Sequence, residues 1–237
     1  MSRTTTDALL GGRIRLVQPA RGNRAAVDPI LLAAAVPAEA SEHALEIGCG
    51  TGAASLALAA RVRGIQVTGL DLQADLVAMA SESARLSGLG SEVGFITGDL
   101  LAPPDDVSGA FDHVMANPPF YRSGSGNLSP DPARRLANME GEADLAAWVR
   151  FALQRAGKTV TFIHIAERAG ELADLFIAAA ADVVLLPVGK RRALVQARPF
   201  GTGVLVTLPP FVLHEADGGF TPAAKAVLWD AAPLPLA

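Results

Sequence analysis

The chain has 237 residues, half of them hydrophobic, which suits one well-packed domain with a small appendage. Its longest apolar runs, such as residues 29–38, are shorter than the ~20 residues of a membrane-spanning helix, and we expect no signal peptide at its N-terminus. The net charge of −4 does not indicate a nucleic-acid-binding protein, and the single cysteine excludes an internal disulfide framework, so we expect a cytoplasmic protein.

Short apolar runs alternate with longer helical stretches along the chain. The predicted strands lie at residues 44–47, 65–70, 93–97, 111–116 and 159–165, with shorter ones at 183–186, 193–197 and 204–208. The predicted helices lie at residues 53–61, 74–87, 142–154 and 168–180. This alternation predicts an α/β domain with a mostly parallel, doubly wound sheet, which binds ligands at the carboxyl ends of its strands.

The first of these strands leads into a glycine-rich turn, E-I-G-C-G-T-G at residues 46–52. Gly48 and Gly50 let the backbone approach a ligand without an intervening Cβ. The G-x-G-x-G spacing differs from the G-x-G-x-x-G of dinucleotide-binding turns. Glu46, directly before the first glycine, suits a ligand with a positively charged amino group and a sulfonium.

Acidic residues also end the next two strands. Asp71, followed by Leu72, lies where a carboxylate can accept hydrogen bonds from two ribose hydroxyls. Asp99, followed by Leu100, can accept one from an adenine amino group. Each Asp alone could be a helix N-cap, but with Glu46 the acids mark three successive strand ends, which favours a ligand site.

This set resembles the cofactor motifs of the class I S-adenosylmethionine-dependent methyltransferases. The resemblance implies a Rossmann-like fold with a seven-stranded, mostly parallel sheet and helices on both faces. It also implies that Asp71 and Leu72 hold the ribose end of S-adenosylmethionine, Asp99 and Leu100 the adenine, and the turn with Glu46, Gly48 and Gly50 the methionine. We predict no metal site.

The fourth strand ends in Asn117-Pro118-Pro119-Phe120-Tyr121, which the two prolines make a rigid turn. A simple stop between strand and loop is the alternative. An exocyclic amine is a poor nucleophile, and the side-chain oxygen of Asn117 and the carbonyl of Pro118 can each accept one of its N–H groups. Phe120 can stack on a flat substrate, a contact worth roughly 1–3 kcal/mol for a nucleobase.

The tetrapeptide resembles the [N/D/S]-P-P-[Y/F/W] motif of methyltransferases that act on amino nitrogens. The resemblance implies that Asn117, Pro118 and Phe120 are catalytic, that Asn117 also contacts the cofactor, and that Pro119 and Tyr121 contact the substrate. The known targets of such enzymes are adenine N6, guanine N2 and the glutamine side-chain amide.

The region before the glycine turn contains L-G-G, Q-P, G-x-R and D-x-x-L-L-A segments between residues 9 and 33. It resembles the start of the bacterial tRNA1(Val) adenine-N6 methyltransferases, which modify the adenine at tRNA position 37. The resemblance implies an N-terminal preamble and lid at residues 1–40 and a methyltransferase domain at residues 41–237. Arg24 and Asp28 are expected near the cofactor's methionine end or the lid, although Asp28 and Pro29 also fit an ordinary helix start.

Positive charge gathers in a few segments of this acidic chain. These are candidate tRNA contacts if they share one face, and solvated surface if they do not. The candidates are Arg24, Arg134, Arg135, Lys190, Arg191 and Arg192.

Two other functions stay open. A glutamine N5-methyltransferase uses the same tetrapeptide but usually carries an extra N-terminal helical domain, for which only about 40 residues precede the glycine turn. A module that binds the cofactor without activity is the second, and intact Asn117 and Asp71 argue against it. The oligomeric state is not predicted.

Overall fold

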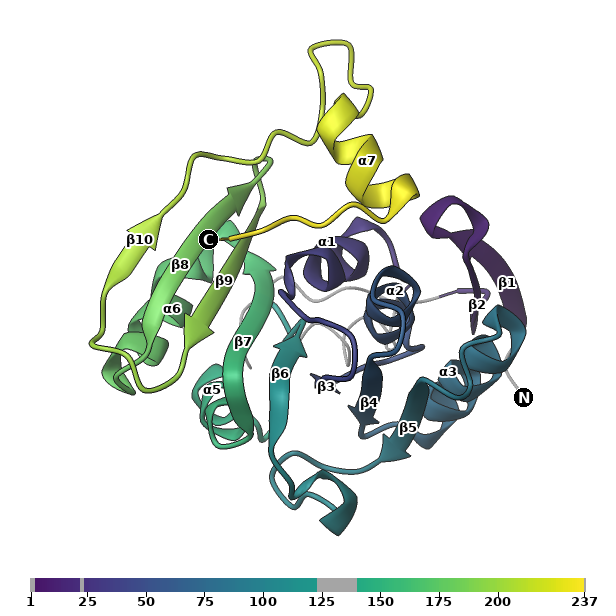
Figure 1. Cartoon of the computed structure of the whole chain (residues 1–237), viewed down its shortest axis with the longest axis horizontal. Helices are drawn as coiled ribbons and strands as arrows, with labels where there is room; N and C mark the ends of the chain where they lie inside the picture. The colour runs from purple at the N-terminus through teal and green to yellow at the C-terminus, as the bar shows by residue number, and fades with distance from the viewer. Residues whose placement is uncertain (1–2, 22–23, 123–139, 237) are drawn as a thin grey trace.

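The computed structural model describes residues 3–21, 24–122 and 140–236. Within them an eight-stranded sheet has the order β10-β8-β9-β7-β6-β3-β4-β5, and all of its strands are parallel except β9 (Figure 1). The strands are β3 (His43–Ile47), β4 (Gln66–Asp71), β5 (Val93–Thr97), β6 (Phe111–Ala116), β7 (Ala156–Ile165), β8 (Asp182–Val188), β9 (Arg192–Arg198) and β10 (Leu205–Thr207).

Helices cover both faces of this sheet, and each face has its own core. Met115 and Ile163 pack in the core of α1 (Val27–Ala35) and α2 (Ala53–Arg61). Their neighbours Val114 and Phe162 pack in the other core, with α5 (Leu145–Leu153) and α6 (Ala169–Ala178). This follows from the alternation of side chains along a strand, and it explains why both faces of these two strands carry apolar residues.

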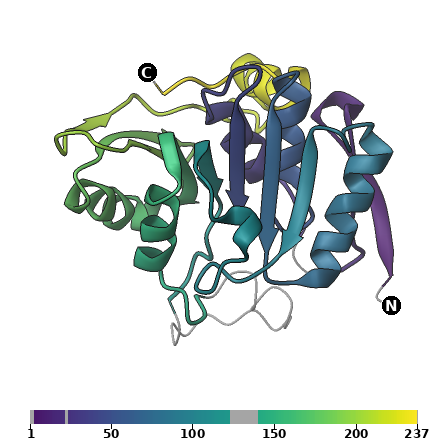
Figure 2. The same cartoon turned by 60° about the horizontal axis from the view of Figure 1, so that its bottom comes forward.

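A separate hairpin of β1 (Thr4–Leu9) and β2 (Ile14–Pro19), joined by the short helix η1 (Leu10–Gly12), lies along α3 (Ala74–Ser87) (Figure 2). Two serines one helical turn apart on α3 accept hydrogen bonds from the edge of β2. The Ser83 hydroxyl accepts from Val17 N at 2.8 Å, and the Ser87 hydroxyl accepts from Arg15 N at 2.9 Å. Side-chain oxygens thus satisfy backbone groups that a further strand would otherwise pair.

The last described residues return to the first helix of the domain. Helix α7 (Pro222–Asp230) packs against α1, and the tail beyond it runs across α1 toward the sheet (Figure 1). The Leu234 N–H donates to the Ala34 carbonyl at 2.8 Å, and the Leu236 side chain is buried. Residues distant in the sequence therefore complete one core.

The predicted fold class is confirmed, with several differences in detail. The sheet has eight strands rather than seven, because the three-residue β10 adds to the edge of β8. Helix α5 begins at Leu145 rather than at residue 142, after Asp144 caps it by accepting from Ala147 N at 2.8 Å. The hairpin and α7 were not predicted. The lid role of residues 1–40 stays a prediction.

The described residues also form the short helices η2 (Asp105–Val107), after β5, and η3 (Ala166–Arg168), between β7 and α6. Among the described residues, no helix has both the length and the apolar character needed to cross a membrane.

Candidate active site

The glycine turn between β3 and α2 has backbone angles that few residues other than glycine adopt. Gly48 and Gly50 have φ of +68° and +55°. A Cβ at Gly48 would lie 2.6 Å from the Trp148 ring, so α5 closes that side of the turn. A Cβ at Gly50 would meet no atom within 4 Å, so this side of the turn is open.

Glu46 is buried at the end of β3 and ties the turn to α2. Its carboxylate accepts from the Ser55 N–H at 2.7 Å and also from the Ser55 hydroxyl. Burial raises the pKa of Glu46 to about 8, although the two Ser55 hydrogen bonds lower it. A cation that binds beside this carboxyl would therefore favour loss of its proton.

Asp71 ends β4, the neighbouring strand, and is also buried. Its two oxygens accept from the N–H groups of Gly50, at 2.7 Å, and Gln73, at 2.9 Å. Burial raises the pKa of Asp71, and these two hydrogen bonds oppose that shift. A carboxylate has about four acceptor positions, so Asp71 can fix the turn and still bind two hydroxyls. Leu72 beside it is 67% exposed, which offers an uncovered apolar surface.

Asp99 follows β5 and is half-buried with Leu100. The carboxylate accepts from Leu101 N at 2.9 Å, as in a local turn. One of its oxygens makes this bond. The structure therefore brings the three predicted strand-end acids to one edge, on the adjacent strands β3, β4 and β5.

Asn117 leaves β6 beside the glycine turn, since Ile47 and Ala116, the residues before Gly48 and Asn117, are partners in the parallel pair β3–β6. Its side-chain oxygen is shielded from solvent and accepts no hydrogen bond within the described residues. A buried acceptor without a partner costs about 1–3 kcal/mol, so folded proteins retain few of them. A substrate N–H would supply the missing bond.

The residues after Asn117 contact side chains from β7 and β9. His164 Nε2 donates to the Pro119 carbonyl at 3.3 Å, and the His164 ring meets the Phe120 ring edge to face, with centroids 5.6 Å apart. The Arg192 guanidinium carbon lies 4.6 Å from the centroid of the Phe120 ring, and Arg192 Nε donates to Asp28 at 2.8 Å.

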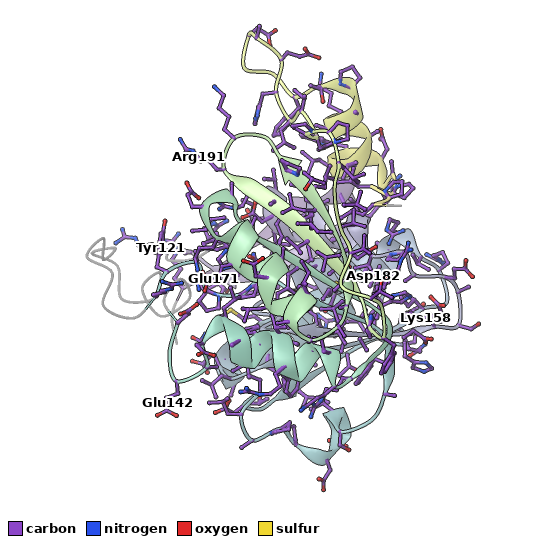
Figure 3. The ribbon with its side chains drawn as sticks, turned by 90° about the vertical axis from the view of Figure 1, so that its left-hand side faces the viewer. Tyr121, Glu142, Lys158, Glu171, Asp182 and Arg191 are labelled. Carbon is purple, nitrogen blue, oxygen red and sulfur yellow. The ribbon has the colours of Figure 1, made fainter. Side chains whose placement is uncertain are left out.

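The predicted basic residues divide by position. Lys190 and Arg191 lie in the turn between β8 and β9, and Arg191 lies on the same side of the molecule as Tyr121 (Figure 3). Arg24 donates to Asp7 at 2.7 Å, to the Thr5 hydroxyl and to the Pro19 carbonyl. Its guanidinium thus holds the N-terminal hairpin. Arg134 and Arg135 lie outside the described residues.

Asp28 does not cap helix α1, so the helix start expected at Asp28 and Pro29 is wrong in its position. Helix α1 begins at Val27, with Ala26 at the N-cap position, so Asp28 lies inside the first turn. Its carboxylate pairs with Arg192 instead. The N-terminus of α1 thus contacts Arg192 of β9, and the Arg192 guanidinium in turn contacts the Phe120 ring.

Sequence reasoning missed three residues of this site: Ser55, His164, and Arg168, whose Nη1 donates to the Phe120 carbonyl at 3.4 Å. His164 stands at the carboxyl end of a predicted strand, which is the signal that located Asp71 and Asp99. Ser55 had no comparable signal, since a serine in an alanine-rich helix has many explanations.

Comparisons with known proteins agree with this geometry. Residues 44–140 match the family model of a methyltransferase domain. A tRNA1(Val) (adenine(37)-N6)-methyltransferase of Aeromonas salmonicida is 28% identical over 82% of this chain and 84% of its own length. A release factor glutamine methyltransferase of Deinococcus radiodurans is 42% identical, over 43% of this chain and 36% of its own length.

The fold has a counterpart among solved structures. The crystal structure of a predicted O-methyltransferase from Agrobacterium tumefaciens superposes with a TM-score of 0.71, at 19% identity, over 88% of this chain and 98% of that one. The fold is that of the Rossmann-like methyltransferases, and residues 44–140 are similar to a methyltransferase domain. The chain spans less than two thirds of the length of several curated relatives that it matches.

The described residues fit S-adenosylmethionine, the predicted cofactor, in agreement with the match to a methyltransferase domain. The open side of Gly50 leaves room beside the turn, and Asp71 keeps acceptor positions for a ribose. Glu46 offers a carboxyl to a positively charged group. The roles of the individual residues stay predictions.

Proposed function

We propose that the chain transfers a methyl group from S-adenosylmethionine to an exocyclic amino nitrogen. The observation that carries the proposal is the side-chain oxygen of Asn117 at the end of β6, which is buried and has no hydrogen-bond partner among the described residues. An amino group has two N–H donors, one for this oxygen and one for the Pro118 carbonyl. A hydroxyl has one O–H donor, and a carbon target has no comparable donor.

The bound cofactor supplies a methyl group on a positively charged sulfur. Asn117 and the carbonyl of Pro118 accept the two N–H groups of the target amine, which concentrates its lone pair toward the methyl carbon. When bound, S-adenosylmethionine would give up the methyl group and keep the electron pair of its C–S bond as a neutral thioether, and the methylated nitrogen would release one proton to solvent. Positioning and exclusion of water account for most of such an acceleration.

We further propose that the amine is N6 of an adenine in tRNA, at position 37. Phe120 offers an aromatic ring next to Asn117, on which a flat base can stack. Lys190 and Arg191 lie in a turn directly before Arg192, whose guanidinium contacts that ring, so cationic groups are available for phosphates. The likeness to the Aeromonas tRNA methyltransferase covers 82% of the chain.

A glutamine side chain in a protein is the second candidate substrate. It is favoured by the 42% identity to the Deinococcus release factor methyltransferase. That likeness extends over 105 residues. The target of this second reaction is an amide nitrogen, which also has two N–H groups, so Asn117 would serve it in the same way.

One assay separates these candidates. Tritiated S-adenosylmethionine is incubated with the chain and, side by side, total tRNA, total DNA and a protein extract that contains release factors. We expect label in tRNA, and N6-methyladenosine after nuclease digestion and chromatography. Label in protein alone would replace adenine by glutamine, and no label in any of the three would contradict the proposed activity.

Replacement of Lys190 and Arg191 by alanine tests the RNA face. Each lost phosphate contact should lower the slope of log affinity for tRNA against log salt by about 1. An unchanged slope would remove these two residues from the interface. Lys225 on α7, replaced in the same way, is the matched control.

A further inference from the structure

The turn that carries Phe120 leaves the sheet and loses the regular hydrogen bonds of β6. Proline fixes φ at residues 118 and 119, but the orientation of the following peptide groups is set by other contacts. Two of the carbonyls in this turn accept hydrogen bonds from side chains. Pro119 O accepts from His164 Nε2 at 3.3 Å, and Phe120 O accepts from Arg168 Nη1 at 3.4 Å.

His164 is well suited to hold one orientation. Its side chain is fully buried at the end of β7. A carbonyl can only accept, so Nε2 carries the proton in this contact. The same ring contacts the Phe120 ring with its planes at 89°, so one residue contacts both the backbone and the aromatic group of the turn.

The charged group that faces His164 is itself fixed. Arg168 forms ion pairs with Glu140, at 2.6 Å, and with Glu171, at 2.8 Å, and its side chain is 12% exposed. Glu171 also pairs with Arg122 at 3.0 Å. Burial, and next the positive charge of Arg168, lower the pKa of His164 to about 4, so the imidazole is neutral near neutral pH.

We propose that His164 is a positioning residue, whose N–H and ring hold Pro119 and Phe120 so that the acceptors of Asn117 and Pro118 keep the geometry that the target amine needs. Such acceptors must stay within about 0.5 Å of their productive positions. The proposal rests on the proposed amino-nitrogen transfer, and it adds a residue that contacts neither cofactor nor substrate.

Three variants separate the two contacts of His164. His164→Phe keeps a ring but lacks the N–H, His164→Gln keeps an N–H donor without the ring, and His164→Ala removes both. Each is assayed below its own unfolding temperature, with the acceptor that the wild-type chain methylates. His43→Phe is the control, because His43 is exposed at the opposite end of β3.

We expect kcat to fall at least tenfold in His164→Phe and further in His164→Ala, with the Kd for S-adenosylmethionine and the KM for the acceptor within threefold of wild type. His164→Gln should recover at least part of the loss relative to His164→Ala. Equal kcat values in wild type and His164→Phe, or a loss seen only in cofactor affinity, would overturn the proposal.

A second measurement is independent of activity. In a ¹H–¹⁵N correlation spectrum of the imidazole, the wild-type chain should show the Nε2–H tautomer of His164, without titration between pH 8 and 5.5. The Nδ1–H tautomer, or a midpoint near 6.5, would overturn the proposal even in a chain that methylates no tested acceptor.

Discussion

The two ends of strands β3, β6 and β7 both carry buried polar side chains, but the hydrogen-bonding groups of these side chains are satisfied to different degrees. At the amino end, His113 contacts Glu42 at 2.9 Å and the Thr159 hydroxyl at 2.8 Å. Lys158 adds ion pairs with Glu42 and with Asp112, the latter at 3.1 Å. Both nitrogens of the buried imidazole thus have a partner within the protein.

At the carboxyl end, the Asn117 side-chain oxygen has no partner in the part of the chain that the structure describes, and Gly50 borders open space. Figure 3 shows the two ends on opposite sides, with Tyr121 on one and Lys158 on the other. A cluster of titratable residues is therefore a weak indicator of a site in this fold. Unsatisfied polar atoms at the strand ends are the more informative feature.

The largest effect on activity is expected at the carboxyl end, from a substitution of Asn117. Asn117→Ala should lower kcat by about 100- to 1,000-fold, the range for loss of one hydrogen bond made in the transition state. The Kd for S-adenosylmethionine, measured by calorimetry, should stay within about tenfold. The unfolding temperature should not fall, because the variant removes an acceptor that has no partner among the described residues.

Asn117→Asp is the matched variant, since it keeps an acceptor of the same shape. Turnover in Asn117→Ala equal to that of wild type would remove the proposed role of Asn117. It would also contradict the view that the unsatisfied polar atom at the carboxyl end of the strands, rather than the cluster at their amino end, marks the site.

At the amino end, where the hydrogen-bonding groups of His113 have partners, a substitution should lower stability and leave activity unchanged. His113→Ala leaves Glu42 and Thr159 with unmatched hydrogen-bonding groups and opens a cavity, so the free energy of unfolding should fall by about 2–4 kcal/mol. Urea denaturation measures this loss. In the folded variant, kcat and the cofactor Kd should stay within threefold of wild type, and a selective loss of kcat would place the amino end in the catalytic machinery.

The smallest expected effect concerns Glu46 and pH. Since burial raises the pKa of Glu46 to about 8, the free protein holds a proton below that pH. A positively charged cofactor should favour the ionised form, so binding releases the proton, and affinity should rise as pH increases from 6.5 to 8. We expect a rise of three- to tenfold, below the tenfold per pH unit that a single proton allows.

Calorimetry at each pH, with Glu46→Gln as the reference, isolates this contribution. The variant has no proton to lose, so the pH dependence that remains in it belongs to the ligand and to other groups. Identical pH dependence in both proteins would restrict Glu46 to its structural bond with Ser55.

The sequence was sufficient to predict the strands from 44 to 165 and the three acids that follow them, because each rests on local pattern and chain order. In a parallel sheet, successive strand ends meet at one edge whatever the loops do. The same logic located Asn117, although its unsatisfied oxygen is visible only in the structure.

Contacts between distant segments were beyond the sequence. Arg192 was predicted as a substrate contact, and the structure pairs it with Asp28, 164 residues away. Arg24 donates three hydrogen bonds to residues of the β1–β2 hairpin. The local sequence pattern did not predict this hairpin, because Leu10 between its two strands has a φ of +52°, which is uncommon for leucine. Such pairings depend on how elements dock, and one sequence carries no direct record of that.

The return of the tail to α1 has a consequence for how the protein is made. About 200 residues separate the hydrogen-bonded partners Ala34 and Leu234, and at 5–20 residues per second a ribosome needs roughly 10–40 s to synthesise that interval. Throughout it, the apolar side of the first helix lacks its final cover. Synthesis of Leu234, rather than emergence of the glycine turn, therefore sets the earliest moment at which this core closes.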